Sequence, residues 1–190
     1  MAATHSQGDK TPRTERGRKT LRKLLDAAAT EFAEKGFHEA SISGITRSAG
    51  VALGTFYTYF DSKDAVFRAL VSDMSAGVGK AAREALDPSM GALEIERVAL
   101  RAFLEFAAEH KEIYRIIDEA EFVDPDSYRA HYETIGSRIE ERLKLGGESG
   151  EFAPGLGTPE AWAVMGMNVF LGLRYVIWGR EGDPDFEEIA

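Results

Sequence analysis

The sequence predicts an all-α protein, and three observations lead to that prediction. Apolar residues recur at intervals of three and four along most of the chain, which is the spacing of an amphipathic helix. No stretch shows the alternating apolar and polar residues of a half-buried strand. Glycine and proline gather in breaks between the periodic stretches. The chain of 190 residues is long enough for a sizeable core, in one domain or in two closely packed ones.

Composition and periodicity divide the chain into three parts. Residues 1–16 are polar and basic, and they are expected to form a disordered arm. Residues 17–64 are expected to form a small helical head, and residues 65–190 a larger helical body. Of the ten Lys and Arg residues in the first 64 positions, seven lie between Lys10 and Lys23. The arm and the start of the first helix therefore carry a concentrated positive charge, which suits contact with phosphates.

Helix ends can be placed from capping residues. The first helix carries Leu21 to Phe32 on its apolar face and is expected to end at Gly36. Ser41 is the expected N-cap of the second helix, and Asp61 or Ser62 caps a fourth that continues to about Leu86. Later helices are expected around residues 98–106, 113–121, 125–145 and 161–180, the last with Thr158 as its N-cap and Pro159 at its first position.

Residues 41–60 have the pattern of a helix-turn-helix. Ile42, Ile45 and Ala49 fall on one face of a short helix, and Gly50 supplies the turn. Phe56 and Phe60 then lie four residues apart on a second short helix. A helix this short is not stable alone in water. It is explained if it packs on a scaffold and presents its remaining polar side chains to DNA.

A family resemblance rests on the same residues. The runs Ala49-Gly-Val51, Gly54-Thr-Phe-Tyr57, Tyr59-Phe60 and Ser62-Lys63 resemble the DNA-binding domain of TetR/AcrR-type bacterial transcriptional regulators. The resemblance extends from about Leu21 to Leu70. It implies a homodimer on double-stranded DNA, paired through C-terminal helices, with a small effector that binds the body and moves the fourth helix. The separation of the two recognition helices would then change.

The net charge of −9 is unevenly distributed. Residues 1–64 carry ten basic and eight acidic side chains, whereas the rest of the chain carries 13 basic and 24 acidic ones. The head is thus slightly positive and the body strongly negative. This division favours DNA contact through the head and discourages non-specific wrapping of DNA around the body.

Candidate DNA contacts follow from side-chain chemistry. Gly54 lets the helix N-terminus approach a phosphate, and Tyr57 and Tyr59 combine an apolar ring with a hydroxyl donor. The alternative for both tyrosines is a plain aromatic core with Phe56 and Phe60. The resemblance implies DNA contact at five of the seven candidate positions, all except Arg47 and Gly54. The full candidate set is Ser43, Arg47, Gly54, Thr55, Tyr57, Tyr59 and Lys63.

Two residues depart from the family pattern. Ala52 stands where relatives usually place a serine that caps the recognition helix, a loss of roughly 1 kcal/mol. Leu53 stands where a polar or basic residue is common. The chain also stops soon after Asp183-Pro184, where many relatives have a further helix. The expected dimer would then be less stable, or its partner helix would be contributed differently.

The last helix is apolar nearly all round. A membrane span is excluded as an interpretation because the apolar run is short and contains Asn168 and Arg174. Burial on two sides is the expectation, with one side on its own domain and the other on a partner subunit. The alternative is the central helix of a monomeric bundle. The candidate dimer residues are Trp162, Val169, Leu173 and Ile177.

The body is rich in aromatic residues, which favours an apolar pocket between helices, although such residues also build ordinary cores. The candidate lining is Phe103, Phe106, His110, Tyr114, Phe122, Tyr132 and Met165. An anionic effector such as an acyl-coenzyme A would find cations among His110, Lys111, Arg115, Arg129 and His131, whose alternative is a solvated helix surface. The effector class stays open between apolar and acyl-CoA-like molecules.

Catalysis is not indicated. The chain has no cysteine, none of its four histidines has metal-ligand spacing, and no nucleophile or phosphate-loop motif is present. The acidic group between Asp118 and Asp126 is interpreted as surface charge rather than as a metal site. No cofactor and no metal are expected. No secretory signal is found, so a cytoplasmic protein is expected.

The sequence therefore predicts a ligand-responsive, homodimeric DNA-binding regulator. We expect it to repress by occupying a palindromic operator and to be released by a small molecule. Two alternatives stay open. One is an activator or nucleoid-associated protein of the same family without an effector. The other is a helical carrier of small molecules that does not bind DNA.

Overall fold

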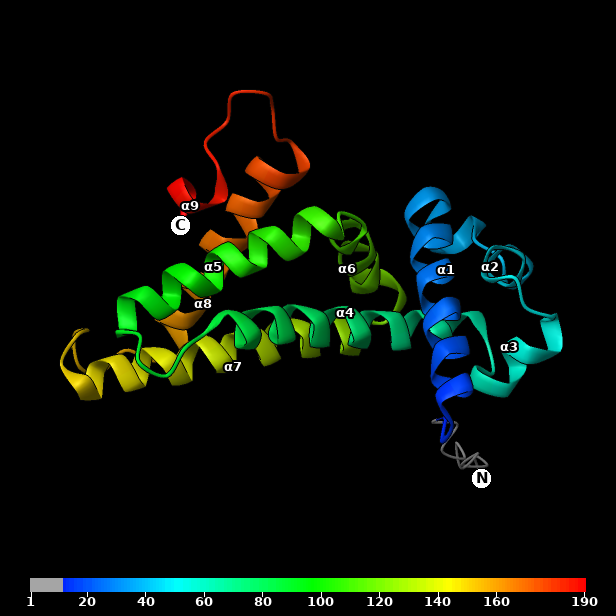
Figure 1. Ribbon diagram of the computed structural model, residues 1–190, viewed down its shortest axis with the longest axis horizontal. Coiled ribbons are helices and arrows are strands. Elements are labelled where there is room, and N and C mark those ends of the chain that lie inside the picture. The colour runs from blue at the N-terminus through cyan, green and yellow to red at the C-terminus, as the bar shows by residue number, and fades with distance from the viewer. Residues whose placement is uncertain (1–11) are drawn as a thin grey trace. The chain divides into compact units, whose positions relative to one another are not determined.

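The computed structural model describes residues 12–190, and within that range the protein is helical and contains no strand (Figure 1). The predicted all-α class is confirmed. The helices are α1 (Glu15–Glu39), α2 (Ile42–Ala49), α3 (Leu53–Tyr59), α4 (Lys63–Ala85), α5 (Ala92–Glu109), α6 (Glu112–Val123), α7 (Pro125–Ser149), α8 (Thr158–Gly172) and α9 (Phe186–Ile189), with a π-helical turn, η1 (Leu173–Ile177), directly after α8.

The chain divides into two compact units. Unit 1 ends at Leu70 and unit 2 begins at Val71, so the division falls inside α4 rather than at residue 64. Most of the predicted basic arm lies outside the described residues. Its last part is ordered, because α1 begins at Glu15 and the Thr14 hydroxyl accepts a hydrogen bond from the Gly17 amide at 3.1 Å.

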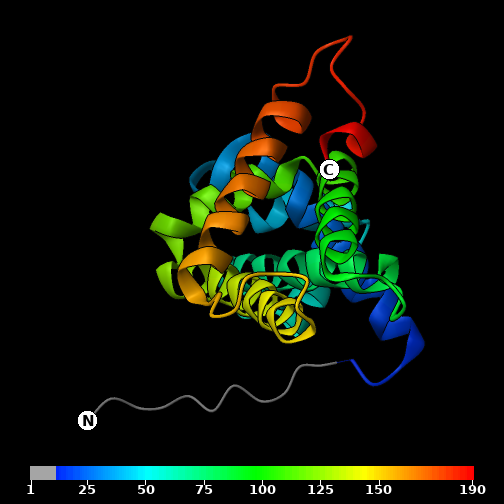
Figure 2. The same cartoon turned by 90° about the vertical axis from the view of Figure 1, so that its left-hand side faces the viewer.

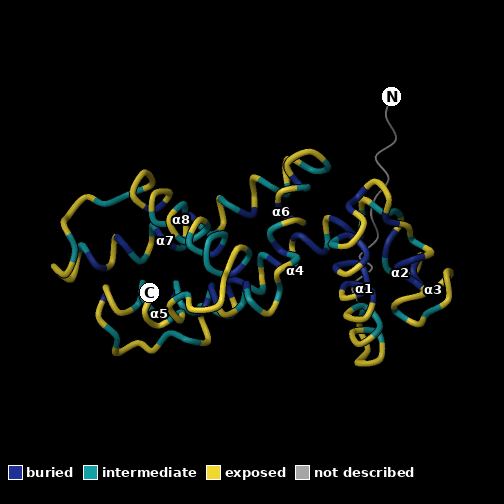
Figure 3. The backbone as a smooth tube through the Cα atoms, turned by 90° about the horizontal axis from the view of Figure 1, so that it is seen from above, coloured by how far each residue is buried: buried dark blue, intermediate teal, exposed yellow. Residues whose placement is uncertain are grey.

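Unit 1 is built on the apolar face of α1. Leu24 and Phe32 are fully buried, and Phe32 meets the ring of Phe67 edge-on at 5.1 Å between centroids. The buried positions of α1 contrast with the largely exposed α3 (Figure 3). A small core of large aromatic side chains thus supports two short helices that have little buried surface of their own.

The predicted helix ends in unit 1 hold with small refinements. Gly36 leaves the helical conformation with φ 76°, a value that glycine adopts without strain, and α1 resumes for one turn beyond it. Ser41 caps α2 by accepting the Gly44 amide at 3.0 Å. Of the two candidate caps for α4, Ser62 accepts the amide of Ala65 at 3.1 Å.

Unit 2 is a bundle in which α8 packs against both α7 and α5 (Figure 2). The chain returns at its end, and α9 lies on α5. Phe186 and Ile189 of α9 pack against the buried cluster around Leu104 and Val176. Glu187 adds ion pairs with two arginines of α5, Arg97 and Arg101.

Two predicted boundaries in unit 2 are wrong. The helix expected to end at about residue 145 is longer, because α7 continues through Gly146 and Gly147 to Ser149 and ends at Gly150 with φ 81°. Any side chain at Gly146 would overlap Phe152, so this glycine serves close packing inside the helix. Thr158 does not cap α8. Its hydroxyl donates to Glu140 instead, and the cap residue is Gly157, whose amide donates to Glu160.

The predicted final helix is divided into α8 and the π-helical turn η1. Buried Gly172 marks this transition. A side chain there would overlap the hydroxyl of Tyr114, which donates to the carbonyl of Val169 at 2.9 Å. Within residues 12–190, no helix combines the length and apolar character needed to cross a bilayer.

Candidate functional site

The helix-turn-helix predicted over residues 41–60 is present. α2 ends at Gly50, whose φ of 66° lies in the left-handed region that glycine favours. The amides of Gly50 and Val51 donate to the carbonyls of Arg47 and Thr46 at 3.2 and 3.0 Å, which closes the turn. Ile45 and Phe56 are fully buried and fix the two helices on the core of unit 1.

A buried carboxylate, Glu31, fixes the start of α2. Its Oε1 accepts the Ser41 amide at 3.2 Å and the Lys35 ammonium at 2.8 Å. The carboxylate occupies the space where a side chain at residue 44 would lie, so Gly44 is required there. Burial alone would raise the pKa of Glu31, but the bonds from Lys35 and Ser41 outweigh it and the pKa is lowered.

Sequence reasoning missed Glu31. One signal was available, because Glu31 directly precedes Phe32 on a helix whose neighbouring positions are apolar. A charged residue at such a position indicates a buried ion pair, but its partners cannot be identified before the fold is known.

Most of the predicted DNA-contact residues lie on the outer surface of α2 and α3. Ser43, Arg47 and Gly54 are exposed, and no atom lies within 4 Å of the space beside Gly54. Tyr57 is 48% exposed, while its neighbour Phe56 is fully buried. The alternative in which Tyr57 belongs to the core is therefore wrong.

Thr55 and Tyr59 are half-buried. The hydroxyl of Tyr59 lies beside Gly17, close to the first turn of α1. Tyr59 therefore packs partly against the scaffold and contributes less open surface than Tyr57. The N-cap residue Ala52 makes no side-chain capping bond, which agrees with the missing serine noted in the sequence.

The contacts of Lys63 differ from those expected of a DNA-binding residue. Its ammonium donates to the carbonyls of Phe37, His38 and Ala40 at 2.7, 3.0 and 3.0 Å. It also lies 4.6 Å from the centre of the Phe37 ring. An ammonium has three donors, and all three are used at the end of α1. This geometry favours a structural role for Lys63 over the predicted DNA contact.

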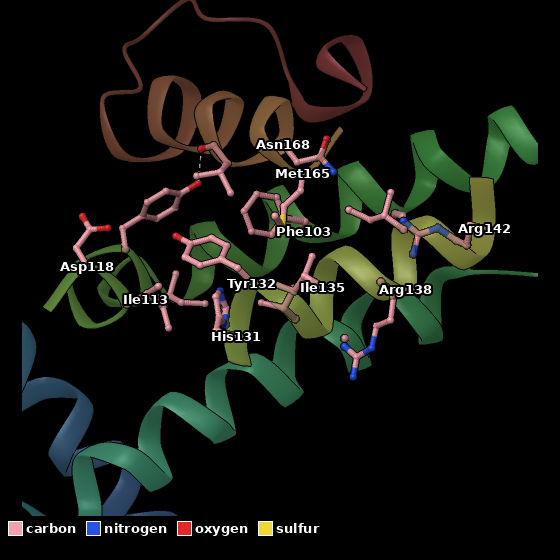
Figure 4. Close-up of a pocket in the computed structure, with 18 residues that line it drawn as sticks. Phe103, Ile113, Asp118, His131, Tyr132, Ile135, Arg138, Arg142, Met165 and Asn168 are labelled. Carbon is pink, nitrogen blue, oxygen red and sulfur yellow. Dashed lines mark hydrogen bonds between the residues drawn. The ribbon is translucent and has the colours of Figure 1, made fainter. Parts of the chain in front are cut away.

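Unit 2 contains a pocket between α4, α5, α6, α7 and α8 (Figure 4). Its cavity volume is about 110 Å³, and most of its lining is apolar. Four of the seven residues predicted for it line the cavity, namely Phe103, Tyr114, Tyr132 and Met165. The lining also includes Val78, Gly79, Ile113, Ile117, Ile135 and Val169.

The other three predicted pocket residues lie elsewhere. Phe122 is 83% exposed at the end of α6. Phe106 packs on Gly77 and on the ring of His110, with 4.5 Å between the ring centres. Helical periodicity marks α5 and α6 as amphipathic, but it does not tell which aromatic residue of a face reaches the cavity.

A buried histidine on the pocket wall has a defined hydrogen bond. Nδ1 of His131 lies 2.6 Å from the hydroxyl of Ser75, and that hydroxyl donates to the carbonyl of Val71 at 2.8 Å. Because a hydroxyl has one proton, His131 must be the donor through Nδ1, which leaves Nε2 as an acceptor. Burial lowers the pKa of His131 to about 4, so the ring is neutral near pH 7.

The pKa values of three acidic groups on the pocket wall are raised. Burial raises the pKa of Tyr114 and of Tyr132. Burial and the nearby charge of Glu121 raise the pKa of Asp118. The wall thus disfavours negative charge at the α6 end of the cavity.

Two arginines of α7 line the pocket and differ in their partners. Arg142 forms a two-bond ion pair with Glu96 at 2.6 and 2.9 Å. Nη1 of Arg138 is buried and makes no hydrogen bond within the described part of the chain. Neither arginine was among the predicted cations. In residues 12–190, no three His, Asp or Glu side chains are grouped as a metal site would require.

The predicted dimer residues are mostly turned inward. Val169 packs on the cluster around Met165, and Ile177 packs on the cluster around Leu104. Leu173 is half-buried, and Trp162, at 44% exposed, is the most open of the four predicted residues. The large exposed apolar side chains of this segment are Trp162, Met167, Phe170 and Trp178.

Known proteins resemble the chain in both sequence and fold. Residues 24–70 match the model of the family described as bacterial regulatory proteins, tetR family. An uncharacterized HTH-type transcriptional regulator of Bacillus subtilis, YdgC, is 32% identical over 53% of this chain and 54% of its own length. This match thus spans about half of that relative. A second regulator of that species, YhgD, is 27% identical over 88% of both chains.

A solved structure extends the likeness to the whole fold. The transcriptional regulator FadR from Bacillus subtilis, in complex with stearoyl-CoA, superposes with a TM-score of 0.75. It is 21% identical, and the alignment covers 88% of this chain and 92% of FadR. At this identity the likeness concerns the fold, with a helix-turn-helix at one end of the chain and a helical body after it.

Proposed function

Because the chain belongs to the TetR family of helix-turn-helix, DNA-binding transcriptional regulators, we propose that it is a cytoplasmic, homodimeric repressor that an acyl-chain effector releases from its operator. The observation that carries the proposal is the presence of two sites in one chain. An exposed recognition helix lies in unit 1, and an apolar cavity with a few polar groups lies in unit 2.

The DNA contacts are proposed at the exposed surface of α2 and α3. Gly54 leaves the first turn of α3 open, so a phosphate can approach its amides. Tyr57 offers an exposed ring and hydroxyl, and Ser43 and Arg47 of α2 are exposed for backbone contacts. Two such heads require half-sites about 34 Å apart, or a multiple of that distance.

The homodimer is proposed to form through the outer face of α8. Trp162, Met167 and Phe170 are exposed there, and nothing lies within 4 Å of the space beside Gly166. Large apolar side chains beside a glycine favour the close approach of another helix. A second copy of α8 supplies the same surface, so a two-fold interface is self-complementary.

The effector is proposed to be a molecule with an acyl chain. The pocket has an apolar lining suited to such a chain, and FadR, which has the same fold, has been solved with stearoyl-CoA. Helix α4 begins in the head with Lys63, and its later residues Val78 and Gly79 line the pocket. A ligand that fits better when α4 is shifted would favour a conformation with lower operator affinity.

The direct test is selection of bound fragments from genomic DNA by the purified protein, followed by affinity measurements against salt. The proposal expects a palindromic site, a dimer by molar mass, and a steep decrease of affinity with salt concentration. The Tyr57→Ala protein is the matched comparison and should bind the selected site more than tenfold less tightly. A protein that binds acyl ligands but selects no DNA sequence would instead be a carrier.

A further inference from the structure

Arg138 is the feature of unit 2 that the fold does not explain. Its Nη1 is buried on the pocket wall, without a hydrogen-bond partner within the described part of the chain. An arginine keeps its charge at every physiological pH, so it cannot escape this position by losing a proton. The side chain as a whole is half-buried, but the enclosed Nη1 is a donor without an acceptor, which is unfavourable unless a bound anion or water completes it.

The packing around Arg138 makes room for its head group. Gly79 of α4 faces the guanidinium, and any side chain at residue 79 would overlap Nη1. In Figure 4 the Arg138 side chain extends from α7 toward the ribbon of α4. The sequence thus combines a long cation on one helix with a glycine on the facing helix.

Arg142 serves as an internal comparison. It lies one turn further along α7 and lines the same pocket, but its guanidinium donates two hydrogen bonds to the Glu96 carboxylate. The carboxylate Asp118 also lines the pocket, at the opposite end of the close-up from Arg138 (Figure 4). The cavity therefore has the Asp118 carboxyl group at its α6 end, and on α7 the guanidinium of Arg138, whose Nη1 has no partner within the described residues.

Between these ends the wall is apolar. Phe103, Ile135 and Met165 lie between Asp118 and Arg138 in the same view. A matching ligand has an alkyl chain along this wall and an oxyanion at one end. A guanidinium can bind either a carboxylate or a phosphate through two parallel bonds.

We propose that Arg138 is the anion anchor of the pocket, and that it binds the oxyanion of an amphipathic ligand whose alkyl chain lies between α5, α7 and α8. The proposal rests on the proposed function for the idea that an effector enters this cavity. Two sources carry this chemistry, the carboxylate of a free fatty acid and the phosphates of an acyl-CoA.

The test is direct binding without DNA, by calorimetry, of dodecanoate, its methyl ester and dodecanoyl-CoA. The wild-type protein should bind at least one of the two anions tenfold or more tightly than the uncharged ester. Arg138→Gln should reduce that preference to less than twofold. Arg129→Gln is the control. The sequence suggested Arg129 as a cation for the effector, but it is exposed on the same helix and does not line the cavity, so its loss should keep the preference.

The pattern of binding shows whether Arg138 binds a carboxylate or the phosphates of an acyl-CoA. Dependence of dodecanoate binding on Arg138 indicates the carboxylate, and dependence of dodecanoyl-CoA binding alone indicates the phosphates. Equal affinity for ester and anions in the wild type, an unchanged preference in Arg138→Gln, or no binding of any of the three would overturn the anchor. If the anchor holds but saturating ligand leaves operator affinity unchanged, the proposed function fails and the anchor stands.

A measurement of unfolding guards against a purely structural role. Because the enclosed Nη1 donor has no acceptor, Arg138→Gln should leave the Tm of the ligand-free protein unchanged or higher. A structural arginine would give the opposite result. Gly79→Ala keeps the charge but fills the space of the guanidinium, and it should also lose the preference for the anion.

Discussion

The two units treat a buried charge in opposite ways. In unit 1 the carboxylate of Glu31 is buried and accepts bonds from Lys35 and the Ser41 amide. In unit 2 the guanidinium of Arg138 has a buried nitrogen without a partner. The first arrangement fixes the start of α2. The second holds nothing in place within the described residues.

This difference separates structural charges from functional ones. A buried charge that its own fold satisfies contributes to a rigid scaffold, which a DNA-reading head needs. A buried donor that the fold leaves without a partner raises the free energy of the empty protein. A ligand that supplies the partner removes this cost. On this view, unit 1 is complete as folded and unit 2 is completed by its effector.

Removing the Glu31 carboxylate should have the largest effect on stability. Glu31→Ala removes the partner of Lys35 and leaves the Ser41 amide unsatisfied, which should lower the free energy of unfolding of unit 1 by about 3 kcal/mol. Denaturation followed by circular dichroism measures this. Glu34→Ala, at an exposed position of the same helix, should change stability by less than about 0.5 kcal/mol. Equal effects of the two substitutions would contradict the scaffold role of Glu31.

Acid should destabilise unit 2 through His131. Burial lowers the pKa of His131 in the folded state to about 4, from 6.5, so between these values the unfolded chain binds a proton that the folded protein does not. Stability is therefore lost as the pH falls from 6.5 to 4, by roughly 3 kcal/mol in all. Unfolding curves across this range should show the loss, and His131→Asn should reduce it.

Lys63 should behave as part of the scaffold. Lys63→Met removes three hydrogen bonds to the end of α1 and should lower the free energy of unfolding by about 2 kcal/mol. At temperatures where the variant is folded, the slope of log affinity against log salt should match the wild type. A slope reduced by about one, without loss of stability, would show that Lys63 contacts a DNA phosphate after all.

Tyr57 should act at the surface without affecting the scaffold. Tyr57→Ala should lower operator affinity more than tenfold, or about 1.4 kcal/mol, because it removes an exposed ring and hydroxyl from α3. Fluorescence anisotropy of a labelled operator measures this. The helicity and unfolding midpoint should stay at wild-type values, as should the operator affinity of Tyr128→Ala in unit 2. A parallel loss of folding would assign Tyr57 to the core instead.

The sequence predicted unit 1 well because its signals are local. The spacing of Phe56 and Phe60, the turn at Gly50 and the cap at Ser41 each depend on neighbours within a few residues. The sequence favoured an exposed Tyr57 but left a core position open, and the structure decides for exposure. The role of Lys63 was less accessible, because its three acceptors lie at the end of α1, more than 20 residues earlier in the chain.

Unit 2 was predicted in outline, and its site only in part. Aromatic composition indicated a pocket, and Tyr132 and Met165 line it as expected, but Phe122 belongs to the same amphipathic pattern and lies outside. Arg138 was missed, because on a helix with many charged residues the sequence does not distinguish a pocket arginine from a surface one. Its burial depends on Gly79, 59 residues away on another helix. Only the folded structure brings that pair together.

The central claim is that an effector in unit 2 controls the affinity of unit 1 for DNA. The most direct measurement is the dissociation constant of the operator complex with and without saturating dodecanoyl-CoA or dodecanoate, paired with ligand affinity in the free and operator-bound protein. The anion bound through Arg138 should weaken operator binding at least tenfold, and the operator should weaken ligand binding by the same factor. An operator affinity that neither saturating ligand changes would contradict it.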